Sequence, residues 1–184
     1  QLILASLEGD VPRGEADSYA QAMLNILRDD GVDDAFKALM LGLPTESEIA
    51  AAIGRDVDTD QVHAARDRVR AELGRRLAPR LQDIVKATRE TGPYRPDPPS
   101  TARRALRYAA LSLMVIAEPA RGIATALEEL AQPHSMSAEI GALSCLVQID
   151  TPEREAALDQ FHARHGNDHL LIDKWLMLNA QCIG

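Results

Sequence analysis

Residues 58–90 constrain the fold most, because they form the longest run in the chain with one uninterrupted helical pattern. Asp58 or Thr59 can cap its start, and Gly92 with Pro93 should end it. A helix of this length cannot bury an apolar stripe by itself, so neighbouring helices must cover it. The pattern therefore predicts an all-α, layered fold. The stripe has apolar side chains every three or four residues, at Val62, Ala65, Val69, Leu73, Leu77, Leu81, Ile84 and Val85.

A proline lies inside this long pattern. Pro79 removes one backbone donor, so we expect a kink near Ala78 that does not end the helix.

Shorter helical segments precede the long one. Apolar residues within 1–7 suggest the end of a helix, and 15–29 carry a second amphipathic pattern. Asp33 can cap a short helix that runs through Leu41. Thr45 and Glu48 then have the spacing of a capping box, which predicts the start of a further helix.

Helices of about ten to eighteen residues alternate with short loops after residue 100. We expect Ser100 to cap a helix over 101–117, a second helix over 121–131, and Ser137 to cap a third through Ile149. Thr151 and Pro152 should start the next helix, which should end at Gly166.

Asn167 or Asp168 can cap the last helix. Antiparallel helix pairs stacked in series form a superhelical array of the armadillo or HEAT type, and we predict this fold class without finding a fixed repeat.

Composition limits the partners. A chain of 184 residues with 46% apolar and 3% aromatic residues predicts one domain, residues 1–184, with a core of small aliphatic side chains. Its net charge of -8 argues against nucleic acid or an anionic membrane as partner. The longest apolar run, 105–117, is interrupted by Arg107 and is too short to span a membrane. Cys145 and Cys182 are far apart in apolar segments, which favours reduced thiols in a cytoplasmic protein.

Three histidines near the C-terminal end are the only pattern that resembles a metal site. His162, His165 and His169, with Asp168 beside them, have a spacing at which one helix face could bind zinc. Gly166 is expected to break that helix between them. We therefore interpret the cluster as a surface helix end, with metal binding as the alternative.

The remaining candidates are also interpreted as structural. His63 falls on the polar side of the long helix and His134 in a loop, and no nucleophile or carboxylate is arranged near either in sequence. Asp173 and Lys174 directly precede Trp175, the only tryptophan, and could anchor an interface. A core tryptophan with a salt bridge at its edge is the favoured interpretation. No phosphate loop, zincin motif or Ser-x-x-Lys motif occurs, so we predict no catalytic, cofactor-binding or metal-binding residue.

Several segments together resemble the C-terminal helical domain of bacterial aminopeptidase N, a zinc metallopeptidase of the thermolysin-like gluzincin type. They occur in the family's order and at similar separations, and the resemblance spans nearly the whole chain. The segments are Leu43-Pro44-Thr45-Glu46-Ser47-Glu48-Ile49-Ala50, Arg103-Arg104-Ala105-Leu106-Arg107, Met136-Ser137 with Ala142-Leu143, and Asp173-Lys174-Trp175.

The resemblance implies a larger parent, a metalloaminopeptidase of the membrane alanyl aminopeptidase type, that removes N-terminal residues from peptides. It implies that the helical domain roofs the catalytic cavity and limits access to short or unfolded peptides. The zinc, its ligands and the catalytic glutamate would all belong to the catalytic domain of the same parent chain. Residues 1–184 would then be a truncated part of the C-terminal domain.

Two other hypotheses remain open at this point. A free-standing helical scaffold would bind protein partners in its groove, and a native stop codon near Gly184 would identify it. A small helical metal-binding protein would use His162, His165 or His169 as ligands.

Overall fold

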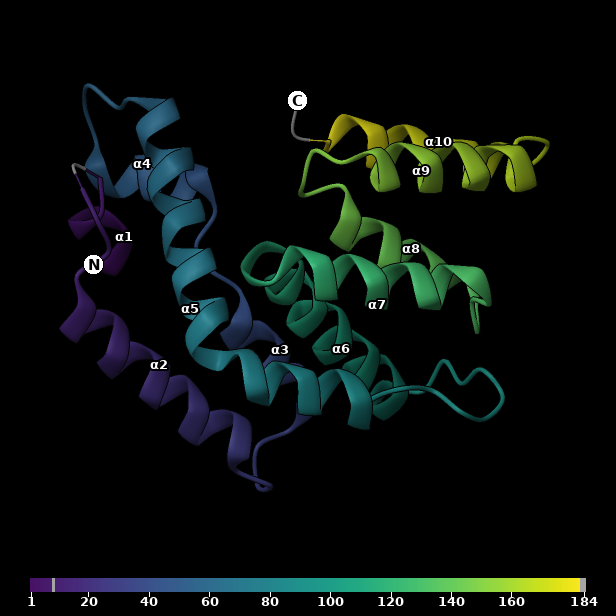
Figure 1. The fold of residues 1–184 in the computed structure, drawn as a ribbon, viewed down its shortest axis with the longest axis horizontal. Coiled ribbons are helices and arrows are strands. Elements are labelled where there is room, and N and C mark those ends of the chain that lie inside the picture. The colour runs from purple at the N-terminus through teal and green to yellow at the C-terminus, as the bar shows by residue number, and fades with distance from the viewer. Residues whose placement is uncertain (8, 183–184) are drawn as a thin grey trace.

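The computed structural model describes residues 1–7 and 9–182, and this part of the chain contains ten helices and no strand (Figure 1). The all-α prediction is confirmed. The helices are α1 (Leu2–Ala5), α2 (Arg13–Arg28), α3 (Asp34–Leu41), α4 (Glu46–Ile53), α5 (Thr59–Ala87), α6 (Pro98–Ala117), α7 (Pro119–Ala131), α8 (Met136–Leu146), α9 (Pro152–His165) and α10 (His169–Ala180).

Helix α5 is the central element, as its pattern predicts. All eight positions of its predicted apolar stripe are buried. Helix α6 provides its largest contact, and α1, α2 and α4 pack against other parts of it. The Asp58 carboxylate caps the start by accepting from the backbone N–H groups of Asp60 and Gln61.

The C-terminal end of α5 comes three residues before the predicted one. The helix ends at Ala87, and Thr88 donates its hydroxyl to the Ile84 carbonyl at 2.7 Å. Glu90 lies beyond the helix and pairs with Arg104 on α6, a contact that helix periodicity does not reveal.

Pro79 lies inside α5 and the helix continues past it. Figure 1 shows that α5 changes direction along its length rather than running straight. This agrees with the predicted kink, because an internal proline cannot donate to the preceding turn.

Helices α6 to α10 stack in successive layers, so the chain rises from α6 through α7 and α8 to α9 and α10 (Figure 1). Only Glu118 separates α6 from α7, and Gly122 of α7 lies against the α6 backbone. A Cβ at position 122 would come within 2.5 Å of the Val115 Cα. The tight reversal between α6 and α7 therefore requires glycine at this position.

Two predicted caps are wrong. Asp97, not Ser100, caps α6, and it accepts from the Ser100 N–H at 2.9 Å. Pro98 and the proline after it fill the first turn, where no donor is needed, so the helix starts three residues earlier than predicted.

Ser135, not Ser137, caps α8 by accepting from the Ala138 N–H at 3.2 Å, and α8 ends at Leu146 rather than Ile149. The predicted caps at Asp33, Thr45, Thr151 and Asp168 and the end at Gly166 are confirmed.

The α6–α7 contact predicts a large effect of one methyl group. Gly122→Ala should lower the free energy of unfolding by about 2 kcal/mol or more, because the Val115 backbone cannot move without shifting α6. Urea unfolding of the purified chain measures the difference.

Gly14→Ala in α2 is the matched control, because its Cβ would meet nothing within 4 Å. It should be neutral or stabilise by up to about 1 kcal/mol through helix propensity. Equal effects of the two substitutions would contradict the assigned packing.

Candidate functional site

The three C-terminal histidines face different partners. The His162 ring lies 4.6 Å from the Trp175 ring, and His165 Nε2 lies 3.1 Å from a carboxylate oxygen of Glu139. His169 is exposed at the start of α10. In residues 1–7 and 9–182 no three His, Cys, Asp or Glu side chains gather in a way that could hold a metal ion. His162 therefore contributes to the contact between α9 and α10, and His165 to the contact between α9 and α8.

Trp175 joins α9 to α10. Its Nε1–H donates to the Leu158 carbonyl at 3.1 Å, and its ring is half-buried against the core. Asp173 and Lys174 are exposed and form no ion pair within the described residues. The expected packing of the tryptophan is confirmed, whereas the expected salt bridge at its edge is wrong.

His63 has two carboxylate neighbours, so the expectation of no carboxylate near it is wrong: Asp67 lies four residues later on the same helix, a spacing visible in the sequence, whereas Glu46 comes from α4. The His63 Nδ1 lies 2.7 Å from a carboxylate oxygen of Glu46 on α4, and its Nε2 lies 3.4 Å from Asp67. The hydrogen bond with Glu46 raises the pKa of His63 above its usual value. This exposed contact ties α4 to α5. His134 is exposed in the loop after α7, as expected.

A buried charge cluster that the sequence pattern did not predict links three helices. Arg107 on α6 donates from Nη2 to Glu129 on α7 at 2.8 Å, and its Nε bridges both carboxylate oxygens. Arg107 also donates to the Val85 carbonyl on α5, and the Tyr108 hydroxyl donates to Glu129 at 2.7 Å. Burial and this hydrogen bond to Glu129 raise the pKa of Tyr108.

The sequence did hold a signal for this cluster. Arg107 interrupts the longest apolar run, and a buried guanidinium needs a paired carboxylate. The identity of that carboxylate, 22 residues later, depends on how α7 folds back on α6.

A second buried arginine fixes the linker between α5 and α6. Arg104 pairs with Glu90 at 2.7 Å and donates to the Arg95 carbonyl at 3.0 Å. Its guanidinium also lies 4.8 Å from the centre of the Tyr94 ring. The proline-rich linker is thus attached to the body of the domain.

A third polar contact crosses from α5 to the end of α8. Arg70 donates to Gln148 and to Ser112, and Ser112 and Gln148 also bond each other. Burial lowers the pKa of Arg70. Cys145 lies nearby with its thiol donating to the Tyr108 carbonyl at 3.5 Å, and burial raises the pKa of this thiol. A protonated, enclosed thiol is a packing group rather than a nucleophile.

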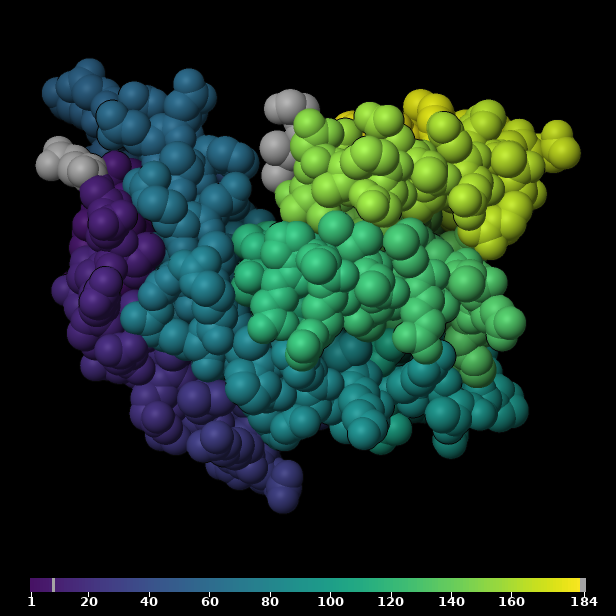
Figure 2. Space-filling view, viewed as in Figure 1, coloured from purple at the N-terminus to yellow at the C-terminus, as the bar shows by residue number. Residues whose placement is uncertain are grey.

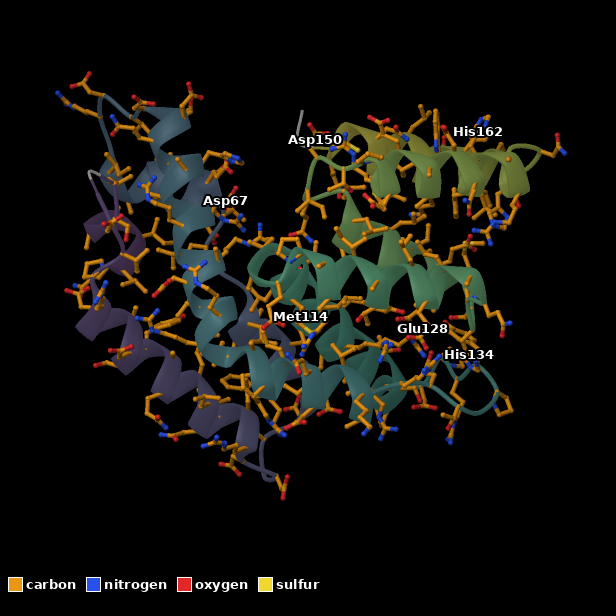
Figure 3. The ribbon with its side chains drawn as sticks, viewed as in Figure 1. Asp67, Met114, Glu128, His134, Asp150 and His162 are labelled. Atoms are coloured by element: carbon orange, nitrogen blue, oxygen red, sulfur yellow. The ribbon has the colours of Figure 1, made fainter. Side chains whose placement is uncertain are left out.

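Two of the hollows among the described residues lie at helix junctions. A charged pocket of about 410 Å³ lies where α5, α6 and α7 meet, and Figure 3 labels Met114, Glu128 and His134 around it. A larger apolar groove of about 1200 Å³ lies among α1, α2, α4 and α5.

Figure 2 also shows a notch between the blue α4–α5 region and the green and yellow α9–α10 region. Figure 3 places Asp67 and Asp150 on its two sides.

The whole described chain matches one protein family. Residues 1–183 match the family described as "Domain of unknown function (DUF3458_C) ARM repeats". This chain belongs to that family. The description agrees with the stacked helices of the structure, and the predicted armadillo-like fold class is confirmed.

Two longer proteins are similar to this chain in sequence. Aminopeptidase N of Caulobacter vibrioides is 31% identical over 180 residues, which are 98% of this chain and 21% of that protein. Aminopeptidase N of Escherichia coli is 27% identical over 161 residues, or 88% of this chain and 18% of that protein. The chain thus spans about a fifth of the length of these relatives.

A solved structure has the same fold. The crystal structure of Legionella pneumophila aminopeptidase A in complex with aspartic acid superposes with a TM-score of 0.75 at 17% sequence identity. The match covers 90% of this chain and 20% of that one. The resemblance to aminopeptidase N inferred from the sequence segments is confirmed.

Removing one partner of the Arg107–Glu129 pair should destabilise the fold strongly, because the other charge stays buried. Glu129→Ala leaves the Arg107 charge buried without its partner and should cost about 3–5 kcal/mol of unfolding free energy. Urea unfolding measures the loss. Glu128→Ala is the control one residue away, since Glu128 is 65% exposed and should change stability by less than about 1 kcal/mol.

The His63–Glu46 contact predicts a change that NMR can follow. Glu46→Gln should lower the pKa of His63, because the hydrogen bond to the carboxylate favours the protonated ring. Glu153→Gln, on distant α9, should leave the His63 titration unchanged. A titration of His63 that is the same in all three proteins would contradict the contact.

The raised pKa of His63 makes the stability of the fold depend on pH. The pKa of His63 is higher in the folded protein than in the unfolded chain, where it is about 6.5. The contact between His63 and Glu46 therefore stabilises the fold fully below pH 6.5, and this stabilisation is lost as the pH rises through the pKa of His63 in the folded protein. The effect should be small because His63 is 42% exposed.

Proposed function

We propose that residues 1–184 form one non-catalytic helical domain, part of the C-terminal domain of a zinc-dependent aminopeptidase that removes N-terminal residues from peptides. The observation that carries the proposal is the alignment of 98% of this chain with aminopeptidase N of C. vibrioides. The second aminopeptidase N and the aminopeptidase A fold support the same assignment.

The proposed role is to roof the catalytic cavity and limit it to short or unfolded peptides. A curved stack of helices with a notch between α4–α5 and α9–α10 has the shape to cover another domain without enclosing it (Figure 2). The polar contacts of Arg70, Arg104 and Arg107 hold the stack rigid across several helices. A rigid roof excludes folded proteins by shape and can keep water from the reacting groups.

The described residues of this chain do not form a binding site for the proposed zinc ion. His162, His165 and His63 contact Trp175, Glu139 and Glu46 respectively, and the described residues offer no group of three donors for a metal. The ligands would therefore come from the catalytic domain of the same parent, which is the proposed partner together with the parent's peptide substrates.

We also propose a cytoplasmic location. Cys145 and Cys182 are both unpaired, which suits a reducing compartment. Among the described helices, none combines the length and the apolar character that crossing a bilayer requires.

The proposal predicts where activity resides. Purified residues 1–184 should release no amino acid from aminoacyl chromogenic substrates, with or without added zinc, while the parent should do so. Chelator-sensitive turnover by the isolated chain would contradict the proposal.

Roofing is tested in the parent with peptides of increasing size. A parent without residues 1–184 should keep its zinc, measured by elemental analysis, but should lose its preference for short over long or folded substrates. An unchanged ratio of kcat/KM between short and long substrates in this zinc-loaded deletion would contradict the roofing role.

A further inference from the structure

The charged pocket where α5, α6 and α7 meet plays no part in the proposed roofing role. Its volume of about 410 Å³ lies within the range of about 300–1,000 Å³ that is usual for small-molecule sites. Helices α5 and α7 each pack on α6, and residues of all three helices line the pocket. Arg89 of α5 pairs with Glu128 of α7 at 3.0 Å, so a side-chain contact connects two of its walls.

A buried guanidinium in this pocket has hydrogen-bond donors to spare. Arg107 lines the pocket with a side chain that is only 6% exposed, and an arginine side chain has five N–H groups. Its Nε and Nη2 donate to Glu129, and its Nη1 donates to the Val85 carbonyl. Two of the five N–H groups therefore have no acceptor within residues 1–7 and 9–182. Leaving buried donors of a charged group unpaired is costly, so the pocket favours an acceptor that enters from outside the chain.

The charges of the pocket are unevenly matched. Lys86 of α5 forms no ion pair with any residue that the structure describes, and Arg121 of α7 reaches only Glu118, at 3.7 Å. All three glutamates that line the pocket, by contrast, already have an arginine partner. The pocket therefore retains positive charge although the whole chain has a net charge of -8. The paired glutamates are Glu90 with Arg104, Glu128 with Arg89, and Glu129 with Arg107.

We propose that this pocket binds a small organic oxyanion, a carboxylate or a phosphate monoester. Its charged oxygens accept hydrogen bonds from Arg107, Lys86 and Arg121, because bonds of this kind to an ionised acceptor are the strong ones. Its carbon part contacts Val85 and Met114, which line the pocket with buried apolar side chains (Figure 3 labels Met114). A bound anion would thus connect α5, α6 and α7.

Acylation of lysine in the full-length parent tests the proposal at one side chain. Lys86 and Lys174 are both exposed, but only Lys86 lines the pocket. N-hydroxysuccinimidyl acetate modifies both amines, and mass spectrometry measures the rate at each position. Benzoate or phenyl phosphate at about ten times its Kd should slow the modification of Lys86 about tenfold, because the free fraction of the site falls to about a tenth. At constant ionic strength Lys174 should be unaffected, and uncharged benzamide should protect neither lysine.

Two arginine variants of the parent test the contact with the anion. Arg121→Gln should raise the anion concentration for half-protection of Lys86 about tenfold, because it removes a charge-assisted hydrogen bond. Arg103→Gln is the matched control, since Arg103 is also exposed but does not line the pocket, and it should change that concentration less than about twofold. Equal half-protection in both variants and the unsubstituted parent would contradict the proposed contact.

The remaining outcomes also decide the question. Protection by only one of the two anions supports the proposal and identifies the head group. Equal protection by benzamide, or protection by inorganic phosphate as strong as that by phenyl phosphate, would contradict recognition of an organic oxyanion. No protection would contradict it too, as would a Lys86 that is unreactive in the parent before any anion is added, because the pocket would then be covered. Labelling does not require turnover, so a lack of aminopeptidase activity would contradict the proposed function alone.

Discussion

The pairing of Arg107 with Glu129 is the interaction on which the central packing depends. It brings α6 and α7 together, and the same guanidinium reaches the Val85 carbonyl on α5. Apolar surface alone would let these helices slide against each other, because small aliphatic side chains pack in many registers. A buried ion pair of this kind adds little net stability over an apolar replacement, yet it strongly penalises any register that separates the two charges.

The other buried arginines extend this control outward. Arg104 holds the linker through Glu90, and Arg70 joins α5 to Gln148 at the end of α8. The result is a stack in which helices far apart in sequence are fixed relative to α5. Rigidity of this kind is what a domain needs if it acts by shape.

Local features of the fold were predictable from the sequence because they depend on local forces. The 3.6-residue period marked every buried position of the α5 stripe, and the capping box at Thr45 and Glu48 needs only four residues. The predicted helix cap was wrong where two residues able to cap a helix lie close together in the sequence, as Asp97 and Ser100 do. The partners of His63 and Arg107 were missed because 17 and 22 residues separate them from Glu46 and Glu129, so that only tertiary packing brings them together.

We propose that these helices form the rigid, non-catalytic cover of a larger aminopeptidase. A crystal structure of the parent with a bound peptide tests it most directly. The account predicts that the notch between α4–α5 and α9–α10 faces the catalytic cavity, and that no side chain from residues 1–184 coordinates the zinc. A structure in which this domain faces away from the cavity, or supplies a metal ligand, would contradict the account.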